Sequence, residues 1–215
     1  MSQRLAAAWV RLVRFGFHLL YNQFAWTYDA VSWIVSLGEW RRWQLAVLPF
    51  VRGNVLEIAH GTGHLLTTLT ERGHPVVGLD LSPFMGQIAR RRVRQHQIPL
   101  LRASAFDLPF ADAQFDTIIT TFPTNFILDL RTLNTIYRCL KPNGQLLIVP
   151  EGHLLGGTWL HRFIAWLFKI TGQGSGSDAI WDEWHDHFAL VDLKLEAKTI
   201  QHARSRSTVL VVTRD

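Results

Sequence analysis

A short apolar run that leads into a glycine-bearing turn is the feature that most constrains this chain. Residues 55–59 read Val-Leu-Glu-Ile-Ala, and residues 60–64 continue as His-Gly-Thr-Gly-His. Glycines in a strand-to-helix turn let a ligand approach the backbone closely. The next apolar run, residues 76–79, ends on Asp80, whose carboxylate can accept hydrogen bonds from both hydroxyls of a ribose. Together the turn and the acid predict an adenosine site.

Short apolar runs alternate with helical patterns through the middle of the chain. Strands are expected at 55–59, 75–79, 115–121 and 145–149, helices near 63–72, 83–96 and 127–140, and two more strands near 188–197 and 206–213. Parallel βαβ units are the economical explanation of this alternation. We therefore predict an α/β fold, a Rossmann-like doubly wound sheet of about seven strands with helices on both faces. The sheet is expected to be mostly parallel, with an antiparallel last strand.

The turn departs from the dinucleotide-binding fingerprint at one position. That fingerprint requires a third glycine three residues after the second, but Leu66 occupies this position. An adenosine ligand without a diphosphate fits better, and no hydride-transfer constellation is evident. A nicotinamide-dependent dehydrogenase is therefore disfavoured.

Composition narrows the classes of protein and of partner that remain. The 215 residues, 48% hydrophobic and 18% charged, suit one globular domain. The single cysteine, Cys139, is expected in the core of a protein from a reducing, cytoplasmic setting. A net charge of +5 could indicate that the protein binds nucleic acid. The one basic cluster, however, is explained by a solvated helix face; it consists of Arg90, Arg91, Arg92 and Arg94. No nucleic-acid partner and no metal are expected, since the histidines at 185 and 187 lack a third well-spaced ligand.

Several ordered segments resemble a known family. Residues 55–63 look like the first motif of class I S-adenosylmethionine-dependent methyltransferases, and residues 78–85, Gly-Leu-Asp-Leu-Ser-Pro-Phe-Met, look like the second. Residues 103–116 resemble the segment around strands three and four, and residues 137–144 the turn entering strand five. The opening Phe24-Ala-Trp-Thr-Tyr-Asp29, with residues 36–41, is similar to the ubiquinone/menaquinone biosynthesis methyltransferases and to bacterial phospholipid N-methyltransferases.

The resemblance implies S-adenosyl-L-methionine as cofactor and suggests which residues bind it. Glu57 would brace the turn and face the methionine amino group, and Asp80 would hold the ribose. The family commonly has Asp where this chain has Ser104, and Cys or Gly where it has His60. The full set of expected cofactor-binding residues comprises Glu57, Ala59, His60, Gly61, Gly63, Asp80, Leu81, Met85, Ser104, Ala105, Thr121 and Phe122.

Methyl transfer from a sulfonium needs mainly alignment of the acceptor and exclusion of water. A general base is required only when the acceptor must lose a proton, and histidine suits this because its ordinary pKa lies near neutrality. His153, Tyr28 and His60 are the candidates for contact with the acceptor, and each can equally be structural. We expect His153, just past the fifth strand, to contact the acceptor.

Aromatic flanks surround this predicted core. Residues 1–48 are expected to form an N-terminal helical cap, and residues 49–215 the methyltransferase core with an aromatic helical insertion at 153–187. The patterns at 4–18 and 158–170 are amphipathic, with basic and tryptophan residues, so they either cover the site or touch a membrane surface peripherally. A lipid-like acceptor, such as a quinone precursor or phospholipid amine, is favoured. A small soluble acceptor and a non-catalytic cofactor-binding module stay open, as does the oligomeric state.

Overall fold

The fold is a twisted sheet covered by helices on both faces. The computed structural model describes residues 25–156, 184 and 187–214. The strands are β1 (Val55–Ile58), β2 (Val76–Asp80), β3 (Leu100–Arg102), β4 (Phe115–Thr121), β5 (Leu140–Val149), β6 (Gly152–Leu154), β7 (Leu193–Gln201) and β8 (Ser205–Arg214). The α-helices are α2 (Tyr28–Val35), α3 (Trp40–Leu45), α4 (His64–Glu71), α5 (Pro83–Arg92) and α6 (Leu130–Cys139), with single 3-10 turns at Ala25–Thr27, Leu48–Phe50, Arg94–His96 and Asn125–Leu128.

The strand order is β3-β2-β1-β4-β5-β8-β6, and β7 pairs with β8 along residues 206–214, on the edge opposite to β5 and β6. The first five strands are mutually parallel, whereas β5, β6 and β7 each pair antiparallel with β8. Within the described residues, β8 alone therefore runs against the other strands. The predicted sheet with an antiparallel last strand is confirmed, and the short β6 brings the described sheet to eight strands.

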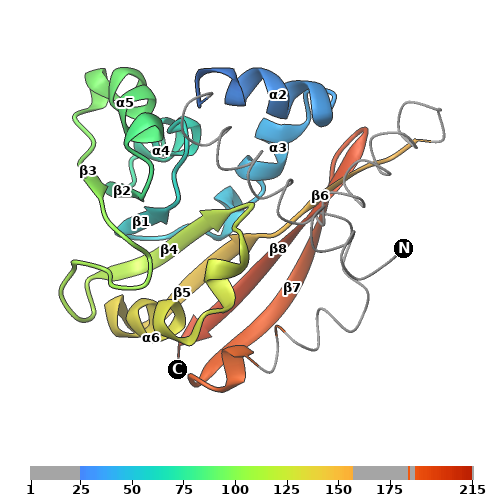
Figure 1. Ribbon diagram of the computed structural model, residues 1–215. Coiled ribbons are helices and arrows are strands. Elements are labelled where there is room, and N and C mark those ends of the chain that lie inside the picture. The colour runs from blue at the N-terminus through green and yellow to red at the C-terminus, as the bar shows by residue number, and fades with distance from the viewer. Residues whose placement is uncertain (1–24, 157–183, 185–186, 215) are drawn as a thin grey trace, which may run out of the picture.

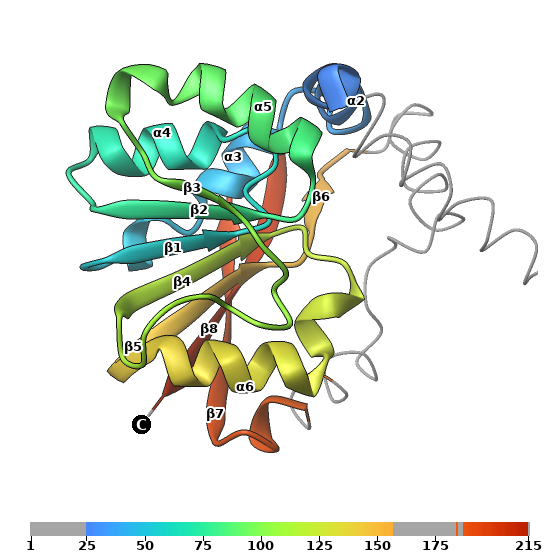
Figure 2. The ribbon, with the colours of Figure 1, turned by 60° about the vertical axis from the view of Figure 1, so that its left-hand side comes forward.

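Burial explains why the central strands form. All four residues of β1 are buried, as expected for a parallel strand with helices on both sides. Leu56 and Ile58 pack toward α6, whereas Val55 belongs to the cluster that includes Leu66 of α4. Figures 1 and 2 show α4 and α5 on one face of the sheet and α6 on the other, with α2 and α3 on the side of α4 and α5.

Two parts of the sheet differ from the sequence expectation. The edge strand β3 has only three residues, none fully buried, so no periodic apolar pattern signals it. The strand expected near 188–197 begins later, at Leu193, because Phe188 lies in a short helical turn where its side chain is fully buried. A single large apolar residue buried in a turn mimics the start of a strand in the sequence pattern.

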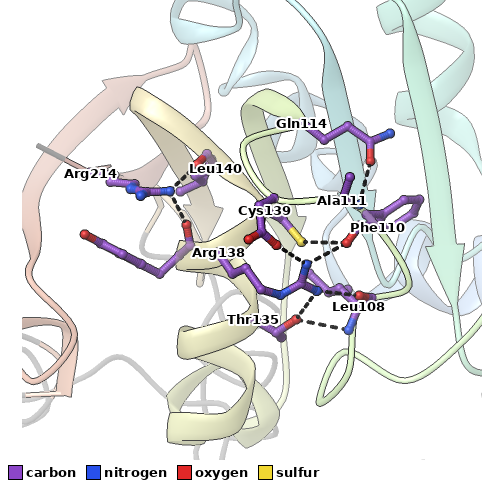
Figure 3. A network of polar contacts seen from close by, with 11 residues as sticks. Leu108, Phe110, Ala111, Gln114, Thr135, Arg138, Cys139, Leu140 and Arg214 are labelled. Atoms are coloured by element: carbon purple, nitrogen blue, oxygen red, sulfur yellow. Dashed lines mark hydrogen bonds and ion pairs between the residues drawn. The ribbon is translucent and has the colours of Figure 1, made fainter.

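Arg138 of α6 fixes the segment between β3 and β4 (Figure 3). Its guanidinium donates to the carbonyl oxygens of Leu108 at 2.8 Å and Phe110 at 2.6 Å, and it pairs with Asp112 at 2.8 Å. Thr135 Oγ1, one turn earlier, accepts a hydrogen bond from the Leu108 N–H. Cys139 is buried as predicted, and burial raises the pKa of its thiol. These contacts position the loop that carries Ser104 and Ala105.

Several expectations fall outside the described residues. They concern the amphipathic patterns at 4–18 and 158–170 and the histidine at 185. Among the helices that the structure describes, none is both long and apolar enough to cross a membrane.

Candidate cofactor and acceptor site

The glycine turn lies between β1 and α4, at the carboxyl end of the parallel strands. Gly61 and Gly63 have φ values of 55° and 81°, in the left-handed region that favours glycine. No heavy atom of the described residues lies within 4 Å of the position that a Gly61 Cβ would take. A Gly63 Cβ would stand 3.0 Å from Ala89 Cβ of α5. Gly61 therefore leaves room for a ligand beside the backbone, whereas Gly63 allows α5 to pack closely.

Asp80 joins this turn to the end of β2. Parallel pairing places Leu79 beside Ile58, so Asp80 follows directly at the same edge of the sheet as the turn. Its Oδ2 accepts a hydrogen bond from the Gly61 N–H at 2.9 Å, and its Oδ1 accepts one from the Ser82 N–H at 2.8 Å. Each carboxylate oxygen keeps a further lone pair, so the group can still accept hydrogen bonds from ribose hydroxyls.

Glu57 lies beneath the turn as a fully buried acid. Burial and the nearby charge of Asp80 raise the pKa of Glu57 well above its usual range, although a hydrogen bond from the Leu66 N–H opposes this. Within the described part of the chain, no group donates to Glu57 Oε2. A buried oxygen without a donor suits an ammonium group such as that of methionine, which would keep the carboxylate ionised. Glu57 and Gly61 therefore fit the implied cofactor.

His60 packs against β2 in this group of residues. Only 4% of it is exposed, and its Nδ1 lies 2.9 Å from the Gly61 carbonyl oxygen. Its Cδ2 lies 2.9 Å from where a Gly78 Cβ would stand, so Gly78 makes room for the ring. Burial lowers the pKa of His60 despite the charge of Asp80. His60 thus lies beside the glycine turn, and both of its roles, cofactor binding and contact with the acceptor, stay predictions.

The residues expected around adenine occupy different environments. Leu81 is 63% exposed beyond the end of β2, whereas Met85 is buried on the inner side of α5. Ser104 Oγ accepts a hydrogen bond from the Phe106 N–H at 3.2 Å, which shapes the turn after β3, and Ala105 packs against the core on the α6 side. Leu81 is free to contact a ligand. The adenine contacts of Met85, Ser104 and Ala105 stay predictions.

An aromatic cluster gathers at the end of β4. Phe122 follows Thr121 with a φ of 51°, and its ring stacks on Trp40 of α3 with centroids 3.9 Å apart. Tyr28, the first residue of α2, meets Trp40 edge to face at 6.3 Å. Trp43 lies 6.3 Å from Phe122 and is 1% exposed. Three of the predicted site residues, Tyr28, Thr121 and Phe122, are thus brought together.

His153 forms a dyad with an acid that the sequence reasoning missed. Its Nε2 lies 2.8 Å from Glu151 Oε1, and both side chains are mostly buried, at 25% and 18% exposed. Gly152, between them, packs on Trp43, and a Cβ at that position would stand 2.1 Å from Trp43 Cδ2. The backbone of β6 therefore touches the aromatic cluster at Gly152, whereas the side chains of Glu151 and His153 point to the opposite face of the strand, because side chains alternate along it. An i,i+2 Glu-x-His spacing after the fifth strand is the signal that could have identified Glu151.

A polar clamp on the glycine turn was also missed. Asp29 of α2 accepts hydrogen bonds from Thr62 Oγ1 at 2.7 Å and Arg92 Nη2 at 2.8 Å, and it lies 3.1 Å from His64 Nε2. Arg92 also donates to the Thr62 carbonyl oxygen. The expectation that the arginine cluster is only a solvated face is therefore wrong for Arg92. Partial burial raises the pKa of Asp29, but the hydrogen bonds outweigh it and hold the pKa well below its usual value.

Among the described residues, no three His, Cys, Asp or Glu side chains gather closely enough to hold a metal ion. What this edge of the sheet offers is a glycine turn, two acids, an aromatic cluster and a histidine–carboxylate dyad. The first three can bind a nucleoside with a cationic amino-acid tail. The dyad can take up a proton from a neighbouring group.

Comparison with known proteins agrees with this geometry. The family model described as "Methyltransferase domain" matches residues 55–144. The demethylmenaquinone methyltransferase of Tropheryma whipplei (strain Twist) is 32% identical over 156 residues, which cover 70% of this chain and 63% of that protein. The protein of the same name from Listeria welshimeri is 30% identical over 161 residues, which cover 69% of this chain and 68% of that protein. The chain thus spans slightly less than two thirds of the Tropheryma protein.

A solved structure shares the fold. The crystal structure of a SAM-dependent methyltransferase from Methanosarcina mazei superposes with a TM-score of 0.56 at 17% sequence identity. The match covers 78% of this chain and 96% of that one. At this identity the likeness concerns the arrangement of the sheet and helices.

Proposed function

The chain belongs to the class I S-adenosylmethionine-dependent methyltransferases, and from this premise we propose that it methylates a hydrophobic, lipid-like acceptor. The relatives of 30% and 32% identity are named for demethylmenaquinone, a quinone with a ring open to methylation. We propose an acceptor of this type: a hydroxylated aromatic ring with an apolar tail.

Glu57, Gly61 and Asp80 would bind the methyl donor. Asp80 would accept from the ribose hydroxyls, Glu57 from the amino group, and Gly61 would leave space for close approach. S-adenosylmethionine supplies a methyl group on a sulfonium, which is already an activated electrophile. The protein therefore needs to orient the acceptor and keep water out rather than provide a nucleophile.

The observation that carries the acceptor proposal is the aromatic cluster of Tyr28, Trp40, Trp43 and Phe122. Its rings come from the cap helices and from the end of β4. The resemblance to the family implies that Thr121 and Phe122, at the end of β4, line the methionine part of the donor site. Aromatic rings favour offset-stacked or edge-to-face contacts with another flat ring. We propose that an acceptor ring binds beside this cluster, with residues 1–48 as the cap over it.

His153 would take the acceptor's proton. Because Glu151 accepts a hydrogen bond from the Nε2–H of His153, the lone pair of the neutral ring is at Nδ1. Nδ1 would remove the phenolic proton, which raises the electron density of the ring carbon that attacks the methyl group. The ring carbon would bond to the methyl group as the sulfur–methyl bond breaks. The ring proton would then pass to solvent water, which restores the aromatic ring as a phenolate, and the phenolate would take its proton back from His153.

The test is a turnover assay with S-adenosylmethionine and a short-chain demethylmenaquinol kept reduced. We expect S-adenosylhomocysteine and a ring-methylated product. His153→Ala should lower kcat by about a hundredfold, the usual contribution of a general base. Glu151→Gln should lower kcat less, because the ring keeps its Nδ1 but loses the carboxylate that orients it. Neither variant should change the affinity for S-adenosylhomocysteine, measured by calorimetry.

Methylation of a phospholipid amine but not of the quinol would overturn the acceptor class. Unchanged turnover of the quinol in His153→Ala would leave the acceptor class standing and remove the proton step from His153. Failure of folded wild-type protein to bind S-adenosylhomocysteine would contradict the cofactor assignment itself.

A further inference from the structure

The apolar side of helix α2 faces away from the core. Two serines are buried instead: Ser32, within the helix, is 5% exposed, and Ser36, directly after it, is 0% exposed. In contrast, Trp33 is 65% and Ile34 60% exposed, and Trp26, just before the helix, is 75% exposed. A globular helix normally buries its apolar side and exposes serine. This inversion marks the outer side of α2 as a binding surface.

The serines are buried for a local reason. Ser36 Oγ accepts a hydrogen bond from the Trp40 N–H at 2.9 Å and contacts the Trp33 carbonyl oxygen at 3.3 Å. The turn between α2 and α3 is thereby closed, and Asp29 anchors the start of α2 to the glycine turn. The orientation of α2 is therefore set by polar contacts on its inner side, which leaves the tryptophans facing solvent.

The surroundings of this surface are basic. Trp26 lines a shallow hollow together with Arg91 and Arg92 of α5. Residues 25–52 contain only two acids, of which Asp29 is paired with Arg92 and Glu39 is 4% exposed. Residues 81–106 contain none, and they include five arginines. The charge facing any partner at this surface is thus positive.

We propose that Trp26, Trp33 and Ile34, with Arg91 beside them, dock the protein on an anionic membrane surface. Tryptophan concentrates at the lipid–water interface, and arginine adds attraction to anionic headgroups. Apolar side chains next to cations, without free acids, match this partner in both hydrophobicity and charge. We name these four residues the docking face.

Docking would place the mouth of the site at the bilayer. Tyr28, at the start of the same helix, belongs to the aromatic cluster. An apolar acceptor could then reach the cluster without crossing water. This consequence rests on the proposed function, whereas the docking face itself does not.

The experiment is co-sedimentation of the full chain with vesicles of phosphatidylglycerol or of phosphatidylcholine. We expect binding to phosphatidylglycerol that weakens as salt screens the charges. Trp33→Ser and Arg91→Gln should each lower the partition coefficient by about tenfold. Leu190→Ser is the matched control, because Leu190 is 68% exposed and precedes β7 in the chain. The segment that leads into β7 lies at the opposite end of the sheet from α2 (Figure 1). Leu190→Ser should bind like the wild type.

Four results would overturn the proposal. Three are no binding to phosphatidylglycerol at low salt, equal binding to both lipids, and an equal loss in Leu190→Ser. The fourth is a dimer in solution that Trp33→Ser converts to monomer, which would assign the face to a second copy of the chain. Affinity for S-adenosylhomocysteine should be unchanged in Trp33→Ser, so failed docking is distinguishable from a failed cofactor site.

Discussion

At the scale of single residues, the backbone at the end of β1 carries strain. Ala59 has a φ of 56°, in the left-handed region that costs a residue with a Cβ about 1 to 2 kcal/mol. Its N–H nevertheless donates to the Leu79 carbonyl oxygen at 2.7 Å, so the sheet fixes the conformation. The strained residue lies directly before His60 and Gly61, where the backbone must turn sharply beneath the ligand site.

Ala59→Gly should therefore stabilise the fold. Glycine relieves the left-handed strain but loses more entropy on folding, so we expect a gain of about 0.5 to 1 kcal/mol in the free energy of unfolding. Urea denaturation measures it. Ala30→Gly, in the exposed part of α2, is the control and should cost about 0.5 to 1 kcal/mol. Equal losses in both variants would contradict strain at Ala59.

At the scale of elements, the Asp29 clamp links the cap to the core. The folded-state pKa of Asp29 is lowered, so the ionised carboxylate stabilises the fold above its ordinary pKa of about 4. That stabilisation is lost as the pH falls through the lower folded-state pKa. Since this acid joins α2 to Thr62 and Arg92, the docking of the helix depends on its charge.

Asp29→Asn should lower stability at about pH 6 and have a smaller effect at about pH 2 to 3, where the unfolded chain takes up a proton at this carboxyl and the wild type has therefore lost part of the stabilisation. The measurement is the urea midpoint of both proteins at the two pH values. Limited proteolysis at about pH 6 should also cut the variant sooner near α2. An equal difference at both pH values would show that the charge of Asp29 has no part in the clamp.

The contact between α6 and the loop after β3 is the second link between elements. Arg138→Lys keeps the charge but not the forked donors that reach Leu108, Phe110 and Asp112 at once. We expect a loss of about 1 to 2 kcal/mol, moderated by the partial exposure of the side chain. Urea denaturation measures it, and faster hydrogen exchange should be confined to residues 104–112. Arg131→Lys, in the same helix, is the control and should change little, since its partner Asp129 is adjacent and the pair is exposed.

At the scale of the whole molecule, we expect ligand binding and folding to be coupled. The proposed cofactor residues come from β1, β2 and the loops that follow them, so a ligand bound there would join elements distant in sequence. S-adenosylhomocysteine at about 100 times its Kd should add about 2.7 kcal/mol to stability. For a chain of this size that corresponds to a rise in Tm of roughly 5 to 10 °C.

Asp80→Ala should abolish this rise in Tm, whatever its effect on the ligand-free protein. Differential scanning fluorimetry with and without the ligand gives both values. A full rise in the variant would show that the cofactor does not depend on Asp80.

The sequence by itself determined the central strands of the sheet and the glycine turn with its acid. Parallel strands buried on both faces need continuous apolar runs, and a ligand at the backbone needs glycine followed by an acid, so β1, β2, β4, Gly61 and Asp80 are visible as local patterns. The edge strand β3 could not be predicted from the sequence, because its three residues, none of them buried, show no periodic pattern of apolar side chains.

Only the tertiary structure decided which side chains meet. Asp29 reaches Thr62 and Arg92, and Trp40 stacks on Phe122, across separations in sequence that no local pattern encodes. The outward orientation of Trp33 was hidden for the same reason, because an apolar residue in a helix is expected to be buried unless other contacts fix the helix first. Local physics selects strands and turns, whereas packing between distant elements selects the neighbours of each side chain.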